Sequence, residues 1–249
     1  MADSDSDGPI SVEELHADRF YCFAHRGAMG YEPENTLASF AKALELGARW
    51  IETDLFLVEG ELVTIHDDRL EATTNGKGRV SQSSLAYLRT LDAGNGQKIP
   101  LFTELLDLVG GRAGINIELK GFGTALALAD ALGQAVSMPS WSSDHFLVSS
   151  FNHPELSVFA AACPEVRIGA LTAGIPLHLA RFAEELGAWS LHLSVNFVTE
   201  ELVRDAQLRG LKVFVYTVNE KQDYERLVGI GVDGIFTDFP DRFCSSPPR

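Results

Sequence analysis

Hydrophobic positions beyond the N-terminal segment fall into two kinds of run that alternate along the chain. Eight short runs rich in β-branched and aromatic residues have the length of buried strands, and the segments between them show the i, i+3, i+4, i+7 spacing of helices. The predicted strands cover residues 20–25, 50–55, 114–120, 146–151, 167–171, 190–194, 212–218 and 234–237. The predicted helices cover residues 37–44, 102–109, 124–136, 154–162, 177–186, 199–209 and 220–228. This alternation predicts an α/β protein, a (β/α)8 TIM barrel, whose functional residues gather at the carboxyl ends of the strands.

A ninth apolar run, residues 62–65, does not fit the barrel pattern. The short link Glu59-Gly60-Glu61 separates it from the second strand, which is too little chain for a parallel crossover, so we expect an antiparallel hairpin over the barrel mouth. Folding about Gly60 would bring His66 back beside Asp54. Residues 68–100 are rich in Gly, Ser, Thr and Asn, so the hairpin and an insertion, with one short helix near 83–89, together span about 61–100.

Length and charge bound the possibilities further. A chain of 249 residues with 45% apolar residues can bury one large core, so we expect a single barrel domain over residues 16–249. Residues 1–15 are acidic and polar, and we expect a disordered tail there. The formal net charge of −15 disfavours nucleic acid as a partner, because binding to phosphate backbones depends on many Lys and Arg contacts.

The cysteines and the apolar runs give an expectation about location. Cys22, Cys163 and Cys244 are an odd number without metal-like spacing, and Cys163 has the helical spacing of a core residue. No apolar run approaches the length of a membrane span, and the acidic N-terminus lacks the pattern of a signal peptide. We therefore expect a cytoplasmic protein without stable membrane insertion; the oligomeric state is left open.

Carboxylates occupy strand positions that should face the barrel mouth. Glu52 and Asp54 share one strand face because they are two residues apart, and Glu118 with Lys120 repeats that spacing on the next barrel strand. Alone, such a pair of acids would be read as solvated surface residues, but its place inside an apolar strand favours a site. Three converging carboxylates repel each other unless a cation neutralises them, and oxygen ligands select Mg2+ or Ca2+.

Other polar residues at strand ends suggest acid–base chemistry and phosphate binding. His25 and His66 could exchange protons near neutral pH, although each could also be a structural histidine at the rim. Arg26 and Lys120 suit phosphate, or alternatively pair with the nearby Glu side chains. Tyr216 is expected to wall the pocket, with a core or interface role as the alternative.

Several motifs in one order resemble the glycerophosphodiester phosphodiesterase family. The resemblance runs from about Tyr21 to Pro240. The motifs are His25-Arg26-Gly27, Pro33-Glu34-Asn35-Thr36, Glu52-x-Asp54, His66-Asp67, Glu118-Leu119-Lys120, Thr217-Val218-Asn219 and Gly234-Ile235-Phe236-Thr237-Asp238. The chain departs from the family where many members have Trp at the position of Tyr216 and a basic residue at that of Ala72. These departures concern the shape of the substrate site rather than the reaction.

The resemblance implies a TIM barrel that hydrolyses glycerophosphodiesters to glycerol 3-phosphate and an alcohol. It implies one divalent cation on Glu52, Asp54 and Glu118. Carried over by motif, the remaining site residues are the acid–base pair His25 and His66, with Arg26 and Lys120 on phosphate. Our hypothesis is that one histidine deprotonates the glycerol 2-hydroxyl, the other protonates the leaving alcohol, and a cyclic phosphate is opened by water.

Two alternatives stay open from the sequence. A phosphodiesterase of the lysophospholipase D type would need an apolar channel, to which Phe151, Phe197 and Tyr216 could contribute. A barrel that binds a phosphodiester without cleaving it is the other, although a binder has no need for two opposed proton-transfer groups. We expect His192, inside the apolar run 191–193, to be structural.

Overall fold

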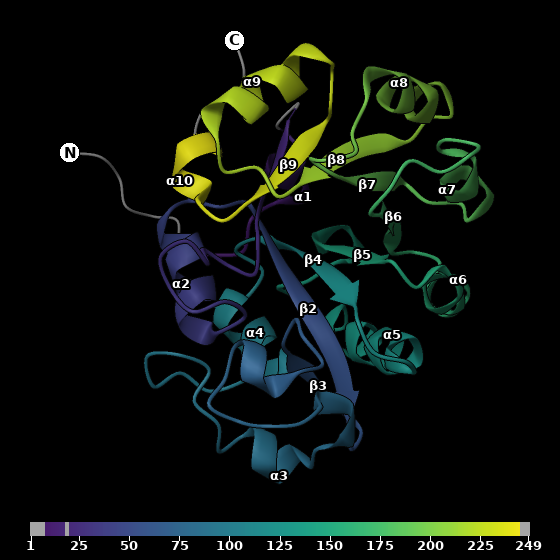
Figure 1. Ribbon diagram of the computed structural model, residues 1–249. Helices are drawn as coiled ribbons and strands as arrows, with labels where there is room; N and C mark the ends of the chain where they lie inside the picture. Colours follow the sequence, from purple (N-terminus) through teal and green to yellow (C-terminus); the bar gives the residue numbers. More distant parts are fainter. Residues whose placement is uncertain (1–7, 18–19, 245–249) are drawn as a thin grey trace.

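The barrel is closed by eight parallel strands, as the sequence predicts (Figure 1). The computed structural model describes residues 8–17 and 20–244. The barrel strands are β1 (Tyr21–Ala24), β2 (Trp50–Val58), β4 (Gly114–Leu119), β5 (Phe146–Ser150), β6 (Arg167–Thr172), β7 (Ser190–Ser194), β8 (Lys212–Tyr216) and β9 (Gly234–Thr237). Neighbours in the chain are neighbours in the sheet, and β1 pairs with both β9 and β2, which completes the ring.

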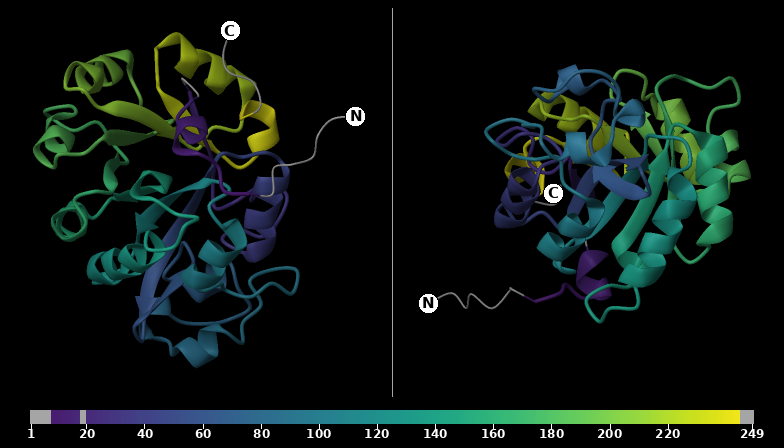
Figure 2. Two further views of the ribbon diagram at one scale, coloured as in Figure 1. Left: turned by 180° about the vertical axis from the view of Figure 1, so that it is seen from behind. Right: turned by 90° about the horizontal axis from the view of Figure 1, so that it is seen from below.

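Helices surround the barrel on the outside (Figures 1 and 2). They are α2 (Leu37–Glu45), α4 (Phe102–Val109), α5 (Thr124–Ala135), α6 (His153–Ala162), α7 (Arg181–Glu185), α8 (Glu200–Leu208), α9 (Lys221–Gly229) and α10 (Pro240–Phe243). The predicted helix 177–186 is too long, because Leu179 has a left-handed φ of 48° and Leu177 is exposed to solvent rather than facing the core. No helix in the described ranges is long and apolar enough to cross a membrane.

The hairpin outside the barrel confirms the prediction for the ninth apolar run. The strand β3 (Glu61–Thr64) pairs antiparallel with the extended end of β2, and Glu59 and Gly60 form the turn with positive φ angles. The backbone N–H of Ile65 donates to the carbonyl oxygen of Asp54 at 3.1 Å, so His66 follows directly beside the carboxylates. The longer β2 is explained by Phe56 and Val58, which pack into a second apolar cluster under the insertion.

That insertion has few regular elements. They are η1 (Leu70–Ala72), η2 (Val80–Gln82) and α3 (Leu85–Leu88), and α3 confirms the short helix expected near 83–89. The buried side chains of Leu70, Val80 and Leu88 join the cluster formed by β2 and β3. The insertion therefore has its own apolar support beside the barrel (Figure 1).

The N-terminal segment corrects one expectation. Residues 12–15, predicted as part of a disordered tail, form the helix α1 (Val12–Leu15) at the amino ends of the strands (Figure 2). Ser11 and Glu14 form a reciprocal capping box, and buried Leu15 packs into an aromatic cluster that includes Trp50. The acidic composition of this segment gives no indication of a capped helix with a buried Leu15. Residues 1–7 of the expected tail lie outside the described residues.

A disulfide joins the two ends of the barrel. Cys22 in β1 is bonded to Cys244, which directly follows α10. The odd number of cysteines and the sequence separation of 222 give no sign of the pairing, because barrel closure alone brings the two cysteines together. Cys163 is buried with a free thiol, as expected for a core residue.

Aromatic side chains fill the barrel at the amino ends of its strands. The rings of Phe23 and Phe236 stack with centroids 4.5 Å apart, and Trp50 and Phe214 pack against Phe23. These residues are buried with Leu147 in one apolar cluster. These aromatic side chains therefore pack the barrel interior at the amino ends of the strands.

Candidate active site

A cavity of about 160 Å3 lies at the carboxyl ends of the strands. Its lining consists of His25, Arg26, Glu52, His66, Asn116, Glu118, Ser149, Phe151, Leu171, His192, Tyr216, Thr217 and Phe236. Six of the predicted site residues are in this set, and the other two, Asp54 and Lys120, are 3.5 Å apart and adjoin it through Glu118. The structure thus brings all the predicted site residues together.

The three predicted ligands form a compact acidic group. Asp54 of β2 is directly opposite Glu118 of β4 in the sheet register, and Glu52 is one strand repeat below Asp54. All three are buried, and each offers a carboxylate oxygen within 4.8 Å of the others. Parallel pairing at equal height therefore gathers carboxylates from stretches that are far apart in sequence.

Burial and mutual repulsion disturb the ionisation of these acids. Burial, and next the charge of Asp54, raise the pKa of Glu52 well above its usual range. The same two causes raise the pKa of Glu118 to about 7. Burial would also raise the pKa of Asp54, but Lys120 and Arg26 outweigh it, so that this pKa is lowered. The three carboxylates therefore outnumber the two cations beside them, Lys120 and Arg26.

The residues fit a hard divalent cation. Asp54 Oδ1 is buried and accepts no hydrogen bond, although the ammonium of Lys120 lies 3.5 Å away. A buried carboxylate oxygen without a hydrogen bond, next to two further carboxylates, matches the all-oxygen donor set that Mg2+ and Ca2+ use.

Arg26 and Lys120 lie on two sides of the acidic group. The Arg26 side chain donates to Glu34 at 2.8 Å and lies 3.4 Å from Asp54, while its backbone N–H donates to Glu52 at 2.8 Å. Lys120 donates to Glu118 at 2.8 Å. The pairing expected between Lys120 and Glu118 is present, and Arg26 pairs through its side chain with Glu34 and Asp54 instead of Glu52.

His25 is held by residues that the sequence analysis did not assign to the site. Its Nδ1 lies 2.7 Å from Asp238 Oδ1, and Asn219 donates to the other oxygen of Asp238 at 2.6 Å. This contact favours the tautomer with the proton on Nδ1, which leaves Nε2 available at the cavity. Asp238 follows β9 directly, so the rule that strand ends carry functional residues could have found it.

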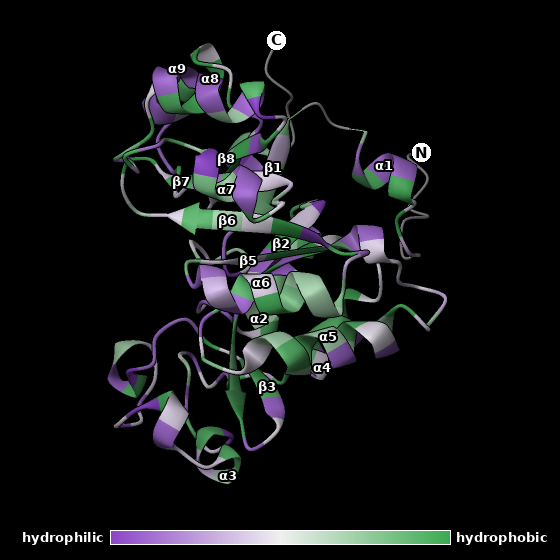
Figure 3. Cartoon of the chain, turned by 90° about the vertical axis from the view of Figure 1, so that its right-hand side faces the viewer, coloured by the Kyte–Doolittle hydropathy of each residue, from purple (hydrophilic) through white to green (hydrophobic). Residues whose placement is uncertain are grey.

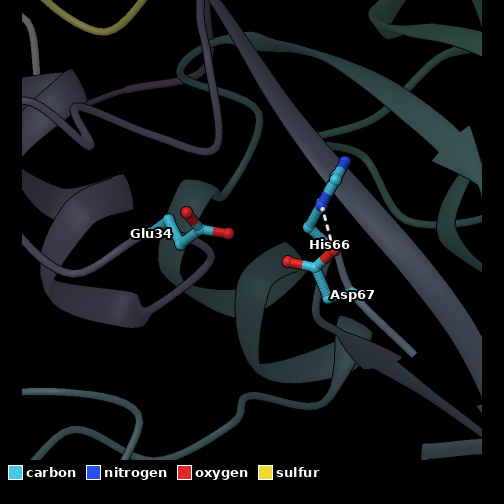
Figure 4. Close-up of side chains that lie close together, drawn as sticks. All are labelled: Glu34, His66 and Asp67. Carbon is cyan, nitrogen blue, oxygen red and sulfur yellow. Dashed lines mark ion pairs between the residues drawn. The ribbon is translucent and has the colours of Figure 1, made fainter. Parts of the chain in front are cut away.

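His66 lies beside Asp67 on the hairpin side, and its buried Nδ1 has no hydrogen-bond partner in the described residues. Its Nδ1 lies 3.3 Å from Asp67 Oδ1, and Figure 4 shows the other ring nitrogen pointing away from Asp67 and from Glu34 across the gap. Burial lowers the pKa of His66, with the charge of Asp54 acting in the opposite direction. Glu34, His66 and Asp67 also lie within ligand distance of one another, but Glu34 is engaged by Arg26 and Asp67 by His66.

The floor of the cavity contains a polar layer that the sequence analysis missed. His192 is fully buried; its Nε2 lies 2.9 Å from Ser190 Oγ and its Nδ1 has no hydrogen-bond partner. Burial lowers its pKa to about 3, so the ring is neutral. Gly169 makes room for this ring, since a Cβ there would lie 2.5 Å from His192 Nε2. Asn116 likewise has a buried Oδ1 without a partner.

The side chain of Asn35 forms hydrogen bonds with two neighbouring residues of β2. Its side-chain amide donates to Asp54 at 2.8 Å and its oxygen accepts from Thr53 at 2.9 Å. The sequence analysis did not place it in the site, although it belongs to a motif of the resemblance. Asn35 therefore fixes the orientation of Asp54 from the opposite loop.

Comparisons with known proteins identify the family of this chain. Residues 25–242 match the model of the Glycerophosphoryl diester phosphodiesterase family. A glycerophosphodiester phosphodiesterase of Caldanaerobacter subterraneus subsp. tengcongensis is 38% identical over 88% of this chain and 93% of its own. The solved structure of an Oleispira antarctica phosphodiesterase in complex with the product sn-glycerol-3-phosphate superposes with a TM-score of 0.84 at 32% identity, covering 93% of this chain and 98% of the other. With a matching fold and matching sequence over nearly its whole length, this enzyme belongs to the glycerophosphoryl diester phosphodiesterase family.

Proposed function

We propose that the cavity hydrolyses glycerophosphodiesters to glycerol 3-phosphate and an alcohol. The observation that carries the proposal is the group of three buried carboxylates within 4.8 Å, beside a cavity whose lining includes His25, His66 and Arg26. The glycerol 3-phosphate bound by the Oleispira antarctica relative supports a small substrate of this kind. The same reaction would place the enzyme in lipid and glycerol metabolism.

Glu52, Asp54 and Glu118 would hold one divalent cation, either Mg2+ or Ca2+. Such an ion polarises a phosphoryl oxygen and stabilises negative charge as it develops. Arg26 and Lys120 would bind the remaining phosphoryl oxygens, the first through its donor fork and the second as a point charge. Their contacts with the acids keep both side chains beside the phosphate position.

His25 and His66 would move the protons. One imidazole takes the proton of the glycerol 2-hydroxyl as that oxygen forms a bond to phosphorus, and the other gives a proton to the alcohol as its bond to phosphorus breaks. Water then opens the cyclic phosphate, and the product is glycerol 3-phosphate. Asp238 acts as a positioning residue, because it holds His25 at 2.7 Å without lining the cavity itself.

The polar floor and the aromatic wall would hold the glycerol end. The free Nδ1 of neutral His192 and the free Oδ1 of Asn116 are suited to a hydroxyl, which both donates and accepts a hydrogen bond. Tyr216 donates its own hydroxyl to Thr172 and meets Phe151 edge to face at 5.9 Å. It therefore contributes a fixed wall that shapes the substrate site.

Release of glycerol 3-phosphate from glycerophosphocholine, followed by a coupled assay, tests the proposal. His25→Ala and His66→Ala should each lower kcat by a factor of about 100 or more, whereas His178→Ala, at an exposed loop position, should not. Activity within tenfold of wild type would remove the histidine from the mechanism. Activity that survives EDTA and exhaustive dialysis would remove the cation.

One observation favours a second substrate class. Phe151 both lines the cavity and remains 43% exposed, so a lysophospholipid could lay its acyl chain beyond it. The ratio of turnover on lysophosphatidylcholine to turnover on glycerophosphocholine tests this. A barrel that binds without cleaving would bind glycerophosphocholine but release no product in either assay.

The cytoplasmic location stays a prediction. The disulfide between Cys22 and Cys244 argues in the other direction, because the cytoplasm keeps most thiols reduced. Fractionation of cells, with the thiols alkylated before lysis, would establish the compartment and the state of the pair together.

A further inference from the structure

Five large apolar side chains are exposed around one half of the barrel mouth. Phe122 and Leu177 are each 90% exposed, Ile175 52%, Phe197 45% and Phe151 43%. Single exposed apolar residues are normal on soluble proteins, but a group around one opening calls for an explanation. We refer to these five residues as the apolar rim.

The apolar rim is built from neighbouring loops. Its residues follow β4, β5, β6 and β7, which are consecutive in the sheet, and each lies between the carboxyl end of its strand and the next helix. Figure 3 shows β6 ending on the side of the molecule where the insertion with α3 also lies. The apolar rim therefore belongs to the same end of the barrel as the cavity, and Phe151 joins the two.

These loops also lack charge. Residues 121–123, 151–152, 173–180 and 195–199 contain no Asp, Glu, Lys or Arg, although such residues make up 22% of the chain. The insertion differs, with the ion pair Arg79–Asp68 inside it and the ion pair Arg89–Glu104 joining it to α4. The loops of the apolar rim thus form one apolar, uncharged stretch of the mouth.

We propose that the apolar rim docks the enzyme onto a zwitterionic lipid surface such as phosphatidylcholine. Exposed aromatic and aliphatic side chains on separate loops can enter the boundary between head groups and acyl chains. A chain with a net charge of −15 and no cation in these loops has no electrostatic attraction to an anionic membrane. The inference rests on the proposed function in one respect, since a lipid surface can deliver phosphodiesters to the cavity.

A protein partner fits the same surface less well. A protein seated on the apolar rim would cover Phe151, which lines the cavity, and would hinder access of substrate from solution. Loops without charged groups also offer few directional contacts for a protein, whereas a lipid boundary requires none.

Sedimentation of the full chain with phosphatidylcholine vesicles tests the proposal. The double variant Phe122→Ser/Leu177→Ser should lose at least tenfold in vesicle partitioning. The matched control is Leu208→Ser, which removes a side chain that is 80% exposed at the far end of α8, and it should partition like wild type. Raising the salt should not weaken binding, and replacing part of the lipid by phosphatidylserine should weaken it.

Several outcomes would overturn the proposal. The first is that wild type remains in the supernatant. The second is that Leu208→Ser loses as much vesicle binding as the double variant. The third is that the double variant converts a dimer into a monomer without changing vesicle binding. The last result would identify the apolar rim as a contact between two copies of the chain. Turnover of glycerophosphocholine, measured on the same samples, should be equal in wild type and both variants. Absence of turnover with intact vesicle binding would reject the proposed function alone.

Discussion

Glu118→Gln should make the ion-free protein more stable while weakening its response to divalent cations. Burial and the charge of Asp54 raise the pKa of Glu118 to about 7, from its ordinary value of 4.5. An acid whose pKa is higher in the folded than in the unfolded state lowers the free energy of unfolding once the pH exceeds the unfolded-state pKa. The loss is complete when the pH is above the folded-state pKa. The shift corresponds to about 3 kcal/mol at pH 8 and to less than about 1 kcal/mol at pH 5.

Urea unfolding in EDTA measures this difference. Glutamine keeps the shape of the side chain and can still accept the hydrogen bond of Lys120, so the substitution removes mainly the buried charge. We expect the variant to exceed wild type by up to about 3 kcal/mol at pH 8, with the gap nearly closed at pH 5. Glu104→Gln is the control: Arg89 helps to lower the pKa of Glu104 despite its partial burial, so removing that charge should destabilise the protein.

Addition of Mg2+ or Ca2+ completes the experiment. An ion at about 100 times its Kd stabilises wild type by about 2.7 kcal/mol, and Glu118→Gln should lose most of this gain. The reasoning is refuted if the variant is no more stable than wild type in EDTA at pH 8. It is also refuted if the ion stabilises both proteins equally.

Three further perturbations test how the site and the barrel are held. Burial works against ionisation of Asp238, but its contact with His25 outweighs burial and its pKa is lowered, so it stabilises the fold above its unfolded pKa. Urea unfolding should find Asp238→Asn less stable than wild type at pH 6, with the gap narrowing below about pH 4; a constant gap would contradict this. In thermal melts, Gly27→Ala should lower Tm more than Gly47→Ala. Both glycines have φ near 78°, but only a Cβ at position 27 would clash with backbone, 2.6 Å from a carbonyl carbon. Equal losses of Tm would contradict the clash. Cys244→Ser should cost about 2 to 5 kcal/mol in urea, and dithiothreitol should reproduce this loss in wild type but not in the variant.

The sequence predicted those parts of the structure that depend on local pattern. His25, Glu118 and His66 are recognisable because apolar runs end at these polar residues and parallel strands end at one face. The hairpin followed from a link too short for a crossover.

Features that depend on distant pairs were not predictable in the same way. Asp238 became a support for His25 only when β9 closed against β1, and the disulfide needed the same closure. The apolar run around His192 predicts a structural role for it, yet strand alternation turns its ring toward the cavity floor. The acids around Ser11 hid a helix cap that depends on burial of Leu15.

The bond between Cys22 and Cys244 makes residues 22–244 a covalent ring. A protease that cuts one exposed loop, such as the segment around Leu177, would leave both pieces attached to each other. The nicked enzyme would migrate as one band without reductant and as two bands with it. Because the pieces cannot diffuse apart, the cut barrel would keep its strands at high effective concentration and could reassemble after unfolding.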